Sequence, residues 1–116
     1  MNNIENIIKD RINHFKNKDY EKIYDIYSID SEFRQFFPSV EVYREHFFKL
    51  IDIFLPVNVE IYKVLYNNEW AEILFVENVR SLEDDVIITY YVKAFFQQEN
   101  GQWKLQQEQR ETAYKK

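Results

Sequence analysis

The polar residues best placed for a function lie within alternating apolar segments of the C-terminal half: Lys63, Glu72, Gln107 and Gln109. On the register that the hairpin turns imply, these four side chains share one face of a sheet, toward one end. A buried charge needs a partner, and Lys63 opposite Glu72 would supply one. We therefore expect a polar site there, in which the two glutamines orient a polar group of a small ligand.

The same region could support acid–base chemistry, with Glu72 as the proton-transfer group and either Tyr90 or Lys63 as its helper. The predicted strand interiors contain no aspartate, however. The two histidines, His14 and His46, each lie at the edge of an apolar helical stripe. The sequence thus favours a non-catalytic site and leaves an acid–base enzyme as the alternative.

Tyrosines follow helical spacing in the N-terminal half. Tyr20, Ile23, Tyr24 and Tyr27 form an i, i+3, i+4, i+7 stripe, which is typical of a helix face that packs on a core. We expect Tyr24 and Tyr27 to form part of the wall of a ligand cavity next to that core.

Metal and cofactor sites are not expected. The chain has no cysteine and only two histidines, without the spacing of a zinc site. The acidic run at 83–85 lacks the spaced oxygen ligands and glycine of a calcium loop. The net charge of −5 disfavours nucleic acid as a partner, because binding to phosphates requires positive charge.

The elements that position these residues change in period near Pro56. Before it, apolar residues follow helical spacing over 4–15, 20–27 and 40–54, with Asp19 and Ser39 as expected N-caps. Residues 28–38 are expected to be irregular. The chain of 116 residues has no Gly/Ser-rich linker or internal repeat, so we expect a single domain over 1–116.

After Pro56 the period is two, which predicts four strands over 57–66, 69–80, 86–99 and 102–112. They are joined by Asn67-Asn68, by residues 81–85 and by Asn100-Gly101, a strong hairpin signal. The predicted fold class is α+β, with three N-terminal helices packed on a curved four-stranded antiparallel sheet.

The faces of this sheet depend on its register. Pairing Glu99 with Gln102 and Arg80 with Val86 turns the more apolar side toward the helices, together with Lys63, Glu72, Tyr90, Gln107 and Gln109. The opposite side then carries Tyr62, Phe75, Tyr91 and Phe95, and a Lys93–Glu108 pair. A bulge in the 81–85 loop would exchange the faces of one hairpin.

That second face is the basis of a partner prediction. Aromatic residues make up 18% of the chain. A monomer rarely exposes a contiguous apolar patch of large side chains. We therefore expect a homodimer that packs sheet on sheet through Tyr62, Phe75, Tyr91 and Phe95, with the same patch on both subunits.

Two short segments carry a family resemblance: Phe15-Lys16-Asn17-Lys18-Asp19-Tyr20 between the first two helices, and Gly101-Gln102-Trp103-Lys104-Leu105 in the last hairpin. With three helices before a meander, the chain resembles the NTF2-like superfamily (SnoaL and ketosteroid isomerase-like, cystatin-like cone fold). The resemblance implies a cone with an apolar cavity and, in many members, dimerisation through the sheet. Some members are isomerases, dehydratases or cyclases.

The expected function is that of a non-catalytic module, which binds a small apolar ligand in the cone cavity or a partner protein through the sheet. The alternatives are a small isomerase, dehydratase or cyclase-type enzyme and a structural dimerisation domain. The chain starts without a signal peptide and has no apolar run of the ~20 residues that a membrane helix needs. A cytoplasmic location is expected, although removal of a leader would leave the same chain.

Overall fold

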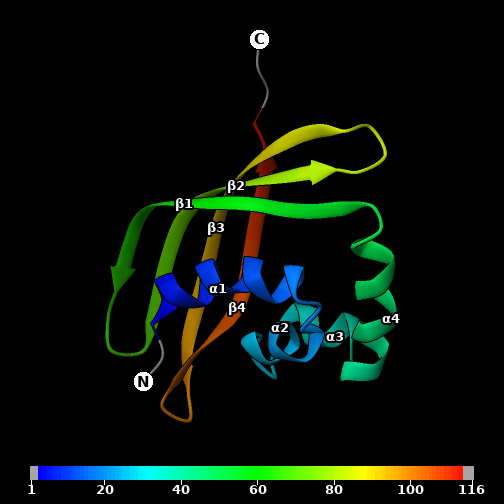
Figure 1. The fold of residues 1–116 in the computed structure, drawn as a ribbon. Helices are drawn as coiled ribbons and strands as arrows, with labels where there is room; N and C mark the ends of the chain where they lie inside the picture. Colours follow the sequence, from blue (N-terminus) through cyan, green and yellow to red (C-terminus); the bar gives the residue numbers. More distant parts are fainter. Residues whose placement is uncertain (1–2, 114–116) are drawn as a thin grey trace.

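The computed structural model describes residues 3–113 and shows an α+β fold in which four helices precede a four-stranded sheet (Figure 1). The class and the order of the elements agree with the sequence prediction. The elements are α1 (Ile4–Lys16), α2 (Tyr20–Ile26), α3 (Glu32–Phe36), α4 (Val40–Leu50), β1 (Phe54–Tyr66), β2 (Trp70–Ser81), β3 (Val86–Glu99) and β4 (Gln102–Thr112).

Side-chain caps begin three of the helices. The Asn3 side chain accepts backbone N–H bonds at the start of α1, Ser31 does so for α3, and Ser39 does so for α4, as predicted. Asp19 is the N-cap residue of α2, but its side chain makes no capping bond. Within residues 3–113, no helix combines the length and the apolar character needed to cross a membrane.

The helical half differs from the prediction in two places. Residues 28–38, expected to be irregular, contain the additional short helix α3. The helix expected over 40–54 ends at Leu50, and Phe54 already begins β1, so Pro56 lies inside a strand. A strand tolerates proline there because β1 is an edge strand, and the register shifts directly after Pro56.

The sheet is an antiparallel meander in the order β1-β2-β3-β4. Its last hairpin has the predicted register, with Glu99 opposite Gln102. Asn100 and Gly101 have φ angles of 54° and 79°, the left-handed conformation that a two-residue hairpin turn requires.

The register elsewhere departs from the prediction by single residues. Val86 pairs with Ser81 and not with Arg80, and bulges lie between Ile61 and Lys63 and between Phe95 and Phe96. Because side chains alternate with a period of two, each shift exchanges the faces of the residues beyond it. The residues predicted to face the helices are therefore correct in β3. They are wrong in β2 and at the ends of β1 and β4.

Two clusters form the core. The larger lies between α1 and the sheet and contains Ile4, Ile8, Ala71, Ile73, Phe75, Val92, Ala94, Phe96, Trp103 and Leu105. The smaller joins α2 to α4 and contains Ile23, Tyr24, Tyr43 and Phe47. The two clusters place the helices on the inner face of the sheet.

The expected cone of three helices wrapped by the sheet is not what the structure shows. α1 lies along β1, α3 contacts β4, and α4 packs mainly on α2 at one end of the molecule (Figure 1). Because α4 buries its apolar face against another helix, four short helices cover the sheet unevenly and do not close a cone with it.

Candidate functional site

A cavity of about 340 Å³ lies between the helices and the inner face of the sheet. Aromatic side chains from three helices and β3 form much of its wall, among them Phe15, Tyr27, Phe33, Tyr43 and Tyr90. Four charged side chains also line it: Arg11, Glu77, Glu108 and Arg110. This combination of a largely apolar wall with a few converging polar groups is typical of small-molecule sites.

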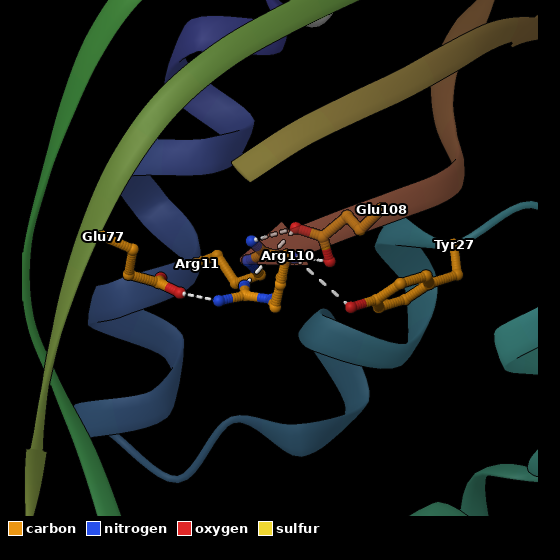
Figure 2. A network of polar contacts seen from close by, with 5 residues as sticks. All are labelled: Arg11, Tyr27, Glu77, Glu108 and Arg110. Carbon is orange, nitrogen blue, oxygen red and sulfur yellow. Dashed lines mark hydrogen bonds and ion pairs between the residues drawn. The ribbon is translucent and has the colours of Figure 1, made fainter. Parts of the chain in front are cut away.

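The most buried ion pair in this cavity joins α1 to β4 (Figure 2). Arg11 Nη1 donates to Glu108 Oε1 at 2.9 Å, and Nη2 donates to Oε2 at 2.8 Å. Their side chains are only 4% and 13% exposed. The pair is thus bidentate and largely removed from water, the geometry in which Arg–carboxylate contacts are strongest.

A second arginine extends the pair into a network. Arg110 Nη1 donates to Glu77 Oε1 at 2.5 Å, and its Nη2 lies 3.4 Å from Glu108 Oε2 (Figure 2). Glu77 is almost fully buried in β2. Two positive and two negative charges therefore compensate one another inside the cavity.

The register shifts explain why sequence reasoning missed this network. The bulge between Phe95 and Phe96 turns Glu108 and Arg110 inward, and the one-residue shift at the β2–β3 loop does the same for Glu77. The predicted outer Lys93–Glu108 pair is therefore wrong, since Lys93 lies opposite Gln109.

One signal could have identified part of the network. Arg11 follows Ile4 and Ile8 at helical spacing and lies within the buried stripe of α1. A single arginine inside such a stripe must find a buried partner, because an unpaired buried charge is very unfavourable.

Tyr27, one of the predicted cavity residues, does lie in this cavity. A backbone bond from Ser28 to Leu105 and a bridge between Tyr27 and Leu105 hold this end of α2 against β4. The Tyr27 hydroxyl accepts a hydrogen bond of 3.3 Å from Arg11, and the Tyr27 ring stacks on Phe33 with centroids 3.7 Å apart.

The ionisation states of the network follow from its burial and its pairing. Burial raises the pKa of Tyr27 to about 12 and also raises the pKa of Tyr43, so both phenols stay protonated. Burial alone would raise the pKa of Glu108, but the charges of Arg11 and Arg110 outweigh it and lower that pKa to about 2. Glu108 therefore remains a carboxylate and cannot exchange protons near neutral pH.

The predicted polar set is found on the opposite face of the sheet. Glu72, Gln107 and Gln109 do come together, around a shallow hollow of about 190 Å³. There Glu72 pairs with Lys93 at 3.8 Å, and Lys63 lies across from Leu74. The expected Lys63–Glu72 pair and its place under the helices are thus wrong, because the bulge after Ile61 and the shift in β2 exchanged the faces.

The other predicted residues divide between the two faces. Tyr90 lines the cavity, whereas Tyr24 is a core residue whose hydroxyl donates to the backbone oxygen of Phe37 at 2.6 Å. On the outer face, Tyr62 and Tyr91 are 65% and 57% exposed, and Phe95 stacks on Trp70.

Phe75 does not belong to the outer face, as the dimer prediction required. It is 1% exposed and packs in the main core, because β2 presents its odd-numbered residues to the helices.

A larger groove, of about 610 Å³, runs beside α3 and is lined by polar residues such as Asp30, Glu32 and Gln97, all of them exposed. Polar side chains that are already hydrated gain little binding energy from contacts with a ligand. The cavity of about 340 Å³ between the helices and the sheet is therefore the better candidate. Across residues 3–113, no cluster of three or more His, Asp or Glu side chains is arranged to hold a metal ion.

No protein-family model and no curated protein sequence matches the chain. Its fold is similar to the solution structure of a SEC-C motif containing protein from Rhodopseudomonas palustris, with a TM-score of 0.70 and 12% identity. The match covers 89% of this chain and 74% of that one. At this identity the likeness concerns the fold alone.

The resemblance to the NTF2-like superfamily is therefore wrong: no family model supports it, and the fold matches a SEC-C motif containing protein. The two short segments behind it are explained by local turns. Lys18 and Gly101 both have positive φ, so those residues meet the needs of a helix–helix turn and of a hairpin in any fold.

Proposed function

We propose that this chain is a non-catalytic binding module that holds a small ligand in the cavity between its helices and its sheet. The observation that carries the proposal is an aromatic cavity containing four charges that are already paired with one another. Such a site offers an apolar surface and fixed polar groups without requiring a charged ligand.

Binding is better supported than catalysis by the protonation states in the cavity. Glu108 is held as a carboxylate and Tyr27 as a neutral phenol, so neither exchanges a proton readily at neutral pH. The enzyme alternative required Glu72 beside Tyr90 or Lys63. Glu72 lies on the outer face of the sheet and Tyr90 on the inner face, which separates these two groups. Lys63 shares the outer face with Glu72, but the ion-pair partner of Glu72 there is Lys93.

Naphthalene, followed by its fluorescence, tests the proposal directly. We expect saturable binding of one molecule per chain that is lost in Val79→Trp, because Val79 lines the cavity and a larger side chain would fill it. Leu74→Trp on the outer face is the matched control and should retain binding. Circular dichroism verifies that both variants fold, and the absence of saturable binding to the wild type would refute the proposal.

A second candidate function, dimerisation, is favoured by the outer face. A groove of about 400 Å³ lies there between Tyr62 and Tyr91, with Leu74 between them and Lys93 and Glu111 nearby. We infer that a second copy of the chain covers it. In a two-fold contact, Lys93 of one subunit can approach Glu111 of the other, so the charges are self-complementary.

The size of the molecule permits such a contact. The molecule measures 42 × 36 × 22 Å, so its broad side is large enough for an ordinary interface of ~800 Å² per partner. Sheet-on-sheet packing would cover the two exposed tyrosines without using the cavity on the other side.

A further inference from the structure

Tyr43 places a hydroxyl on the wall of the cavity. Its side chain comes from α4, is 3% exposed, and packs against Phe33 with ring centroids 5.0 Å apart. Within residues 3–113 the Tyr43 hydroxyl forms no hydrogen bond. The hydroxyl is therefore free to bond a molecule in the cavity, and a ligand that accepts its proton would gain a net hydrogen bond.

The hydroxyl can act toward a ligand mainly as a donor. Burial raises the pKa of Tyr43 far above the neutral range, and the nearby Tyr27 raises it further. The phenol therefore keeps its proton and offers it to an oxygen in the cavity.

The charges in the cavity restrict the ligand further. Arg11 and Arg110 are balanced by Glu108 and Glu77, and each arginine already donates to a carboxylate. A ligand with a net charge would enter without a free counter-charge and would lose its hydration. A neutral ligand avoids this loss.

We propose that the ligand is a neutral, largely apolar molecule with a carbonyl oxygen that accepts a hydrogen bond from Tyr43. Its apolar body would lie against the part of the wall formed by Phe15, Phe33 and Leu50. This assignment rests on the proposed function, because it names the ligand class of the same cavity.

Four probes of similar shape test the assignment: 2-acetylnaphthalene, 2-ethylnaphthalene, 2-naphthoate and 2-naphthylmethylammonium. We expect 2-acetylnaphthalene to bind about tenfold more tightly than 2-ethylnaphthalene, the effect of one net hydrogen bond. The anion and the cation should each bind more weakly than the ketone. Isothermal titration calorimetry measures all four dissociation constants.

Tyr43→Phe isolates the hydroxyl. The tenfold preference for the ketone should disappear in this variant, while 2-ethylnaphthalene binds as it does to the wild type. The urea midpoint should stay the same or rise, since no hydrogen bond within the protein is lost. Tyr91→Phe, on the outer face, is the matched control and should keep the preference.

Different results would refute the proposed ligand class and the proposed binding function. If both neutral probes bind equally well, if Tyr43→Phe retains the preference, or if the naphthoate or the ammonium probe binds most tightly, the ligand class is wrong while cavity binding stands. If no probe binds and naphthalene does not either, both the ligand class and the proposed function are refuted.

Discussion

Arg11 and Glu108 are 97 positions apart in the sequence and are joined by two parallel hydrogen bonds of 2.9 and 2.8 Å. The pair connects the first helix to the last strand across the cavity. It is buried on both sides, so its two charges depend on each other for solvation. The arrangement makes this contact both a structural link and a part of the proposed binding site.

Glu108→Ala should destabilise the fold strongly, because the buried Arg11 would lose the carboxylate that balances its charge. We expect a loss of about 3–5 kcal/mol in the free energy of unfolding, measured by urea denaturation. The double variant Arg11→Met/Glu108→Leu should recover most of this loss. Lys93→Ala breaks the exposed Lys93–Glu72 contact and, as the control, should cost less than about 1 kcal/mol. Equal losses in the two single variants would contradict the prediction.

Stability should fall in acid through Glu108. Its pKa is about 2 in the folded protein against an ordinary value of 4.5. A lowered carboxyl pKa contributes stability that is complete above about pH 5 and is lost as the pH falls toward 2. We expect Glu108 to account for about 3 kcal/mol of this loss.

The measurement compares the urea stability of the wild type and of Glu108→Gln from pH 7 to pH 2. The difference between them should be largest at neutral pH and should shrink below pH 5, because the glutamine does not titrate. A difference that stays constant over this range would show that Glu108 has an ordinary pKa.

Tyr62→Ser/Tyr91→Ser should prevent self-association. The wild type is expected to sediment as a dimer at high micromolar concentration and the variant as a monomer, because both rings belong to the groove on the outer face. Both tyrosines are more than half exposed, so the folding of the monomer should change little.

Phe36→Ser is the matched control for the dimer, since Phe36 is a large exposed apolar residue on α3 that does not line the outer groove. It should leave the dimer intact. A wild type that sediments as a monomer at all concentrations would refute the sheet-on-sheet contact.

Gly101→Ala should destabilise the last hairpin even though there is room for the added methyl group. A Cβ at this position would meet nothing within 4 Å, so any loss comes from the backbone φ of +79°. We expect a loss of about 1 kcal/mol in urea unfolding. Gln102→Ala in the adjoining strand is the control, and an unchanged stability of Gly101→Ala would contradict the assigned turn.

Local chemistry made much of the secondary structure predictable. The change of period near Pro56, the cap at Ser39 and the turn at Asn100-Gly101 each depend on neighbouring residues, and the structure agrees with all three. The short helix α3 was missed because five residues carry too little periodic signal to separate a helix turn from a loop.

The candidate site was predictable only in part. Tyr27 and Tyr90 were expected in a cavity and lie in one, whereas Glu77, Glu108 and Arg110 were not recognised. Each of these three residues lies beyond a single-residue shift in register. No local pattern in the sequence marks a bulge, because the extra residue is chosen by packing between strands and helices.

By itself, the sequence determined that helices come first, that an antiparallel meander follows, and where its final hairpin turns. These features depend on propensity, capping and alternation over a few residues. The tertiary structure alone decided which side of each strand faces the helices. Side chains on a strand alternate with a period of two, so one inserted residue exchanges buried and exposed positions, and only the packed sheet settles where the insertions fall.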